Sequence, residues 1–294
     1  MVATLTAQGI APGTMSGKPN GRQRKVEQEQ VGGRGVVPVS CGYPPGYLLL
    51  SIVKQIEVLA EIFNIPSSST GRALSLAKSK RVSGARLPDG AEGWFAVPSV
   101  DGLARRKFPE VTDPAEKYCR ACKFALRELH SMLSKIDGLG FHNYRPEQIV
   151  PDRFWRTKRT ALMLAEISKQ QYGDILLIPA QFGLLHRGES VQVARTRLRP
   201  REFGLGLFEG TCMLLVHPNR EQKYEQLHID LPGDESCDPD VSSDHDLAPH
   251  FYFSSGEVYR GSEVYRGGKI RLGMTKVTET GIDGSVTGFM PLLL

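Results

Sequence analysis

The chain has 294 residues, of which 40% are hydrophobic and 23% are charged. These proportions are typical of a folded globular protein and exclude a disordered or collagen-like chain. The net charge is +5, and because residues 228–250 hold seven carboxylates and no lysine or arginine, the rest of the chain carries +12. A basic body favours anionic partners such as nucleic acid or a phosphorylated ligand, although such a charge is also ordinary for solubility.

The cellular compartment is predicted from the length of the apolar runs and from the number and spacing of the cysteines. No apolar run reaches the roughly 20 residues that a membrane span requires, and the first residues contain no apolar signal segment. The five cysteines are odd in number and scattered, which indicates reduced thiols rather than a disulfide framework. We therefore expect a cytoplasmic protein without a membrane partner, while the oligomeric state stays open.

The first 90 residues are expected to contain little regular structure. Residues 1–45 are rich in glycine, proline, glutamine and serine without periodicity, which predicts a disordered basic tail. Apolar residues recur at helical spacing over residues 47–63 and predict a helix. The polar, basic segment 67–90 predicts a linker, so we assign residues 46–90 to a helix and linker and residues 91–294 to one α+β domain.

This domain is predicted to combine a buried central strand with packed helices. Residues 94–97 predict a strand, and residues 113–136 predict a helix with Asp113 as its N-cap and Glu116 completing a capping box. Residues 151–170 predict a second helix, and the apolar run 174–179 predicts a buried central strand. Weaker patterns predict helices at 189–198, where a strand competes, and at 202–217.

The C-terminal part is predicted to form short β-strands. Short apolar runs separated by turn residues predict strands at 226–231, 250–253, 270–274 and 286–290. The repeat EVYRG occurs at residues 257–261 and 263–267, which favours a hairpin or a recent local duplication over a solenoid.

Two motifs suggest cofactor chemistry only weakly. Cys119 and Cys122 have metal-ligand spacing but lie on the apolar stripe of a predicted helix, so we interpret them as core residues. Residues 204–210 have the outline of a dinucleotide-binding glycine loop, but residues 199–203 do not predict the preceding strand that such a loop needs.

The acidic segment is the first candidate site. His228 and Asp230 point to the same side of a strand, and a Pro-Gly turn then leads to Asp234 and Glu235. Carboxylates and imidazoles gathered in this way could bind a divalent metal ion, with Asp230, Asp234 and Glu235 as the ligands. Asp244, His245 and Asp246 follow nearby. The alternative is a solvated acidic surface turn.

The second candidate site is the loop that follows the central strand. In α/β arrangements ligands bind beyond the carboxyl ends of strands, where this loop would present Gln181, His186, Arg187 and Ser190. Arginine can bind a phosphate and histidine can transfer a proton near neutral pH. The alternative is an ordinary hydrogen-bonded loop that contains a histidine.

Several short motifs together resemble a known group of proteins. They are Gly93–Pro98, Tyr144–Pro146, Pro151–Asp152, Ile178–Gly183, His186–Gly188, Ser190–Val191, Glu202–Gly206, Cys212–Leu215 and His217–Pro218. Over residues 93–254 the chain resembles an uncharacterised protein family of small-genome bacteria. This family has no known activity, so the resemblance implies no catalytic role.

Two functions remain as hypotheses, and whether the protein is an enzyme stays open. The preferred one is a binding module for an anionic partner such as nucleic acid, in which the loop 181–188 provides selectivity. The alternative is a metal-dependent phosphoester hydrolase, in which His186 or His228 acts as acid or base. Both depend on the loop and the acidic turn meeting in one cleft.

Overall fold

The computed structural model describes residues 42–291 except 137–138, 222, 224, 239–241, 261–262 and 280–282. Its described residues form eight α-helices and eleven strands, which confirms the predicted α+β class. Most of the tail predicted at residues 1–45 lies outside the described residues. Among the described helices, none combines the length and apolar character that crossing a bilayer requires.

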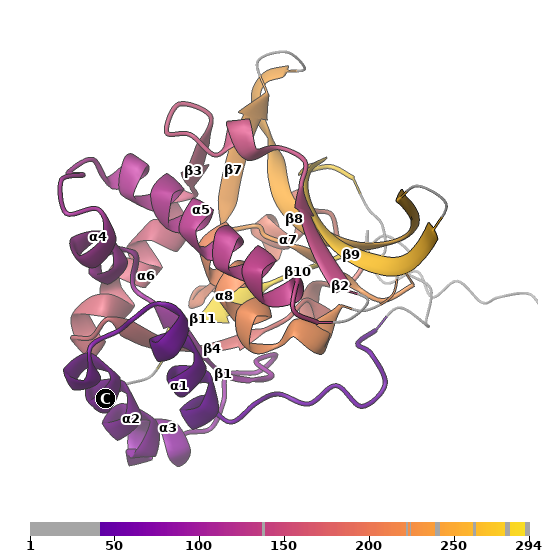
Figure 1. Ribbon diagram of the computed structural model, residues 1–294. Helices are drawn as coiled ribbons and strands as arrows, with labels where there is room; N and C mark the ends of the chain where they lie inside the picture. Colours follow the sequence, from indigo (N-terminus) through magenta and orange to yellow (C-terminus); the bar gives the residue numbers. More distant parts are fainter. Residues whose placement is uncertain are drawn as a thin grey trace, which may run out of the picture.

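The elements follow one another in the order drawn in Figure 1. The helices are α1 (Ile52–Ile62), α2 (Ser67–Lys78), α3 (Lys80–Ser83), α4 (Val100–Lys107), α5 (Pro114–Leu133), α6 (Lys158–Gln171), α7 (Val191–Arg197) and α8 (Leu207–Val216). The strands are β1 (Gly93–Pro98), β2 (Leu139–Asn143), β3 (Phe154–Arg156), β4 (Ile175–Gln181), β5 (Glu202–Gly204), β6 (His228–Asp230), β7 (Asp234–Asp238), β8 (Ser242–Arg260), β9 (Glu263–Lys276), β10 (Asp283–Ser285) and β11 (Thr287–Phe289).

The first sheet is built on the apolar run that predicted a central strand. Its order is β1-β4-β11-β5, and each neighbouring pair is antiparallel. All seven residues of β4 are buried, since β4 lies between two strands and has helices packed against it. The strands predicted at 94–97 and 174–179 are therefore confirmed.

The second sheet contains the C-terminal strands and positions the candidate site. Its main order is β10-β6-β8-β7-β3, and β9 continues it beside β8 with β2 at the outer side of β9. Strand β6 pairs with β10 in parallel and with β8 in antiparallel fashion. In the β8–β9 hairpin the two EVYRG repeats pair with each other, so the predicted hairpin is confirmed.

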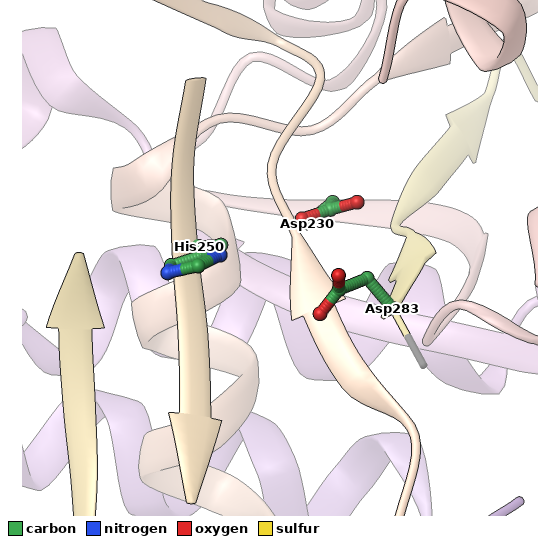
Figure 2. Close-up of side chains that lie close together, drawn as sticks. All are labelled: Asp230, His250 and Asp283. Atoms are coloured by element: carbon green, nitrogen blue, oxygen red, sulfur yellow. The ribbon is translucent and has the colours of Figure 1, made fainter. Parts of the chain in front are cut away.

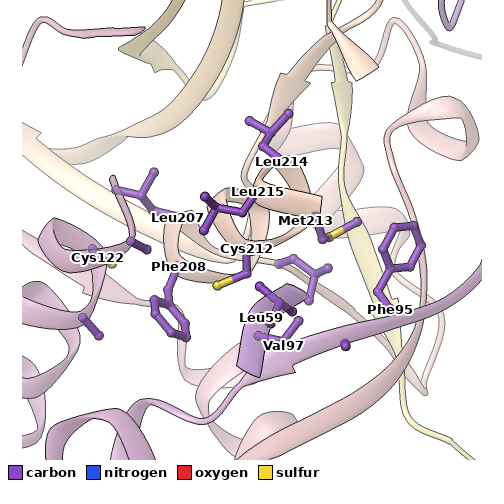
Figure 3. Packing of buried hydrophobic residues seen from close by; sticks show 14 of the residues in the cluster. Leu59, Phe95, Val97, Cys122, Leu207, Phe208, Cys212, Met213, Leu214 and Leu215 are labelled. Carbon is purple, nitrogen blue, oxygen red and sulfur yellow. The ribbon is translucent and has the colours of Figure 1, made fainter. Parts of the chain in front are cut away.

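Helix α8 forms the centre of the hydrophobic core. All ten of its residues are buried, and it packs against α5, α1 and β1. Figure 3 shows its side chains Phe208, Cys212 and Met213 close to Leu59 of α1 and Phe95 of β1. This helix lacks a polar face because it is surrounded by protein on all sides.

Helix α5 confirms the clearest helix prediction. The Asp113 carboxylate caps it by accepting a hydrogen bond from the Glu116 amide at 2.9 Å. The Glu116 carboxylate binds Arg120 at 2.6 Å, whereas the predicted capping box would direct it back to the N-cap. Cys119 and Cys122 are buried on the core face of α5, as their interpretation as core residues requires.

Three local predictions were wrong. The segment 67–83, predicted as linker, forms α2 and α3 because its small residues Ser69, Ala73 and Ala77 bury one face of α2. The helix predicted from residue 151 begins only at Lys158, since residues 154–156 pair with β7 as strand β3. Residues 202–204 form β5, although no strand was expected before the glycine loop.

Two glycines differ sharply in the space around them, which gives a test of the packing. Gly71 lies exposed within α2 and has open space where a Cβ would stand. Gly233 has backbone atoms of Leu205 and Gly204 at 2.5 and 2.6 Å from that position. Gly71→Ala is expected to raise the free energy of unfolding by about 0.5–1 kcal/mol through helix propensity. Gly233→Ala is expected to lower it by about 2 kcal/mol through overpacking.

Chemical denaturation of both variants measures these changes. Equal effects of the two substitutions would contradict the close packing of the turn at Gly233 against the segment between β5 and α8.

Candidate metal centre

Three ionisable side chains from three neighbouring strands lie together in the second sheet. They are Asp230 on β6, His250 on β8 and Asp283 on β10. Each contributes one ligand atom, and these atoms all lie within 4.8 Å of one another. Figure 2 shows the two carboxylates facing each other, with the imidazole on the adjacent strand.

The strand register produces this cluster. Asp230 is paired with His250 across the β6–β8 ladder, and Asp283 is paired with His228 across the parallel β10–β6 ladder. Since residues two apart on a strand share a face, His228 and Asp230 lie on the same side of the sheet as Asp283.

Because side chains alternate between the two faces of a sheet, the face that carries the cluster is polar on β6, β8 and β10. In addition to the cluster it carries His228 on β6, Tyr252 on β8 and Ser285 on β10. The ring of Tyr252 contacts both imidazoles, with centroids 4.9 Å from His250 and 6.1 Å from His228.

A glycine makes room for the imidazole of the cluster. Gly273 on β9 is the cross-strand partner of His250, and a Cβ at this position would stand 2.7 Å from the His250 Nε2 atom. Any larger residue would displace the ring, so the position of the imidazole depends on Gly273.

The cluster contains buried polar atoms that have no hydrogen-bond partner in the structure. Asp230 is only 2% exposed, and its Oδ1 atom has no hydrogen-bond partner. The Nδ1 atom of His250 is also buried without a partner. Burial, followed by the charge of Asp283, raises the pKa of Asp230 well above its ordinary value. Burial also lowers the pKa of His250. A cation at this point would lower the pKa of Asp230, and it would bind the neutral form of His250 that burial already favours.

Two further ionisable groups lie beside the cluster. The Nδ1 atom of His228 is 3.2 Å from an oxygen of Asp283. Glu221 is fully buried, and burial raises its pKa to about 7 despite the opposing charges of His228 and Arg220. His228 therefore interacts electrostatically with Asp283 of the cluster and with the buried Glu221.

The cluster fits a divalent metal ion in its size and its donor atoms. Oxygen and nitrogen ligands bind such ions at about 2.0–2.4 Å, so ligands on opposite sides of one ion are about 4–4.8 Å apart. Two carboxylates with one imidazole suit Mn²⁺, Fe²⁺ or Zn²⁺ better than Mg²⁺ or Ca²⁺, which prefer oxygen alone.

Only one of the three predicted metal ligands belongs to this cluster. The Asp234 carboxylate accepts hydrogen bonds from the Tyr118 hydroxyl at 2.6 Å and from the Leu207 amide at 2.5 Å. Glu235 accepts a hydrogen bond from the Trp155 indole at 3.2 Å. The predicted site of Asp230, Asp234 and Glu235 is therefore wrong, because the turn after β6 sends Asp234 and Glu235 into a different strand.

The position of Asp234 also bears on whether the glycine loop can bind a dinucleotide. The short strand β5 ends at Gly204, the first residue of this motif, and α8 begins within the motif at Leu207. The helix N-terminus, where such a motif would bind a pyrophosphate, already holds the Asp234 carboxylate through the Leu207 amide. Burial raises the pKa of Asp234 to about 7, and the charge of Glu209 adds to this.

The predicted ligand-binding loop is mostly occupied by internal hydrogen bonds. The Gln181 amide group donates to the Ser285 carbonyl at 2.7 Å and accepts from the Gly183 amide at 2.5 Å. Ser190 caps α7 by accepting from the Val193 amide. The loop does reach the strand of the cluster, since the Gly188 amide donates to the Asp283 carbonyl at 2.9 Å. The side chains of Gln181 and Ser190 are thus used structurally.

His186 is buried between two carboxylates. Its Nδ1 atom lies 2.9 Å from Glu189, and its Nε2 atom lies 2.8 Å from Glu202. Burial would lower the pKa of His186, but the hydrogen bonds to Glu202 and Glu189 outweigh burial and raise it. The structure thus holds His186 buried between two carboxylates, away from the cluster. Arg187, by contrast, is exposed.

Sequence reasoning missed His250, Asp283 and Glu221. Asp283 and Ser285 repeat the polar two-residue spacing of His228 and Asp230, and His250 with Tyr252 repeats it again. This spacing was the available signal, but it does not reveal which strands pair. Of the other acidic-segment residues, Asp246 is outside the cluster, and the side chains of 244 and 245 lie outside the described residues.

The buried His186 side chain gives a prediction for stability. His186→Ala leaves Glu189 and Glu202 buried without their shared partner and is expected to lower the free energy of unfolding by about 3 kcal/mol. Because the pKa of His186 is raised in the folded state, its stabilisation is full below about pH 6.5 and is lost as the pH rises through the folded-state pKa.

Urea denaturation at several pH values measures this change. The exposed His142→Ala serves as the control and is expected to change stability by no more than about 0.5 kcal/mol. If His186→Ala lowers the free energy of unfolding by the same amount from acid to alkaline pH, the imidazole contributes by packing alone.

Comparisons of the chain with protein-family models, with curated proteins and with solved structures find no match. The function is therefore argued from the geometry of the described residues.

Proposed function

We propose that this protein binds a divalent transition-metal ion through Asp230, His250 and Asp283 and uses it to hydrolyse a phosphate ester. The observation that carries the proposal is the convergence of three ligand atoms within 4.8 Å, including a buried carboxylate oxygen without a hydrogen-bond partner. An uncompensated buried carboxylate is costly, and a bound cation removes that cost.

The ligands differ in their access to solvent, which supports catalysis rather than a purely structural ion. Asp230 is buried, whereas the Asp283 side chain is 20% exposed and His250 is half-buried. Catalytic metal sites keep a coordination position open for water. With three protein ligands, an ion would keep positions for a water and for an oxygen of the substrate.

His228 is the acid or base in this proposal. Its Nδ1 atom lies 3.2 Å from Asp283, so the imidazole adjoins the coordination sphere without being one of the three ligands. A metal ion lowers the pKa of its bound water, and a neighbouring imidazole can take the proton as this water attacks phosphorus.

Metal binding is tested by comparing two buried aspartates that lie four residues apart. In the wild type, Mn²⁺ or Zn²⁺ at a hundred times its Kd should raise the free energy of unfolding by about 2.7 kcal/mol. Asp230→Asn removes a ligand and should abolish this shift. Asp234→Asn is the matched control: it lowers the starting stability but should retain the shift, because Asp234 caps α8 and lies outside the cluster.

The pH dependence of binding is a further readout of the same experiment. The Asp230 carboxyl must lose its proton to bind the ion, and its pKa is raised. The metal affinity should therefore rise with pH and fall under acidic conditions. A metal-induced shift that Asp230→Asn and Asp234→Asn retain equally would remove the proposed centre.

Hydrolysis is tested with bis(p-nitrophenyl) phosphate in the presence of Mn²⁺. The wild type should turn this diester over, and Asp230→Asn should be inactive. His228→Asn should lower kcat by about a hundredfold or more while keeping the metal affinity within about tenfold. Metal binding without turnover would leave a metal-binding protein and refute the hydrolase.

We also propose a second function, the binding of an anionic partner such as nucleic acid. The observation in its favour is a row of basic side chains, Lys123, Arg127 and His130, on the exposed surface of α5. Residues three and four apart lie on one face of a helix, so these three form a continuous stripe.

A further inference from the structure

A shallow groove of about 380 Å³ lies between α5 and β2. Helix α5 lines one side, and strand β2 with the residues that follow it lines the other; Figure 1 shows that the C-terminal part of α5 lies beside β2. The polar and aromatic side chains that line it are Lys123, Arg127, His130, Phe141, His142 and Asn143. The groove is separate from the candidate metal centre, since the two share no residue.

The groove is basic. Among the described residues that line it there is no carboxylate, whereas Lys123 and Arg127 carry full positive charges. Arg127 pairs with Glu128 on the flank of the helix at 3.0 Å, yet its side chain stays 66% exposed. Exposed cations of one sign beside an open groove complement a polyanion.

Aromatic rings are interleaved with these charges. Phe141 lies in the groove with its ring centroid 6.4 Å from that of His130. Tyr144 lies outside the residues that line the groove; its ring contacts that of His142 at 4.3 Å, and the Arg271 guanidinium lies 5.2 Å from it.

We propose that this groove binds single-stranded nucleic acid. Lys123 and Arg127 contact the backbone phosphates, while one base enters the groove against Phe141. A single strand is favoured over a duplex because only unpaired bases expose their faces to aromatic rings. This inference rests on the second proposed function and gives it a location.

Fluorescence anisotropy with a labelled 12-residue oligothymidine and its oligouridine counterpart tests the proposal. Lys123→Glu/Arg127→Glu should weaken binding at least about tenfold, and the slope of log affinity against log salt should fall by roughly 1.4, since about 0.7 is lost per phosphate contact. Phe141→Leu removes the ring on which the base stacks and should weaken binding while leaving the slope unchanged.

The matched control reverses two exposed charges elsewhere. Lys78→Glu/Arg81→Glu makes the same change of charge on α2 and α3, which lie at the opposite side of the molecule from β2 (Figure 1). This variant should bind within about twofold of the wild type if the contacts are local rather than set by net charge.

The possible outcomes separate the location from the function. Wild-type protein that binds neither oligonucleotide refutes the anionic-partner function and the groove together. Binding that both double reversals weaken equally refutes the groove and leaves the function standing. Equal affinity for inorganic polyphosphate, or a preference for duplex, refutes single-stranded nucleic acid as the occupant.

Discussion

The structure around the candidate centre depends on one constraint, the position of the short strand β6 between a parallel and an antiparallel neighbour. Strands β10 and β8 pair with its two edges, so Asp230 cannot turn toward water along either edge. Alternation of side chains then places the ionisable groups of all three strands on one face. The register therefore forces Asp230 beside His250 and Asp283, and Gly273 completes the arrangement by leaving space for the imidazole.

Two other buried ionisable groups, His186 and Asp234, are balanced by partners, whereas both carboxylate oxygens of Glu221 are buried without a hydrogen-bond partner. His186 lies between Glu189 and Glu202, and Glu189 also binds Arg197 at 2.7 Å. Asp234 is held by the Tyr118 hydroxyl and a backbone amide. The Asp230 cluster differs because its carboxylates outnumber its imidazole and a buried oxygen stays without a donor. This difference in charge balance distinguishes a candidate site from a structural network.

The groove and the metal centre are supported by the same sheet. One row of paired residues runs from Asn143 through Leu272 and Phe251 to Ile229, which is the neighbour of Asp230. Three strand spacings of about 4.8 Å separate the ends of this row, or about 14 Å. Substitutions within the sheet would disturb both features, whereas the exposed side chains of α5 can be changed independently.

Much of the secondary structure followed from local patterns. The capped helix α5 and the apolar strand β4 were predicted because capping and continuous burial act over neighbouring residues. Helix α2 was missed because its serines and alanines become a buried face only against α1. Strand β3 was missed because Phe154 and Trp155 fit a helical stripe equally well until β7 pairs with them.

The sequence by itself determined the α+β class, the β-rich C-terminal part and Asp230 with His228 as members of a candidate site. Only the tertiary structure decided that His250 and Asp283 join Asp230, and that Asp234, Glu235 and His186 do not. The physical reason is that spacing along a strand sets the face of a side chain, whereas its partners across the sheet are set by pairing between segments distant in the chain.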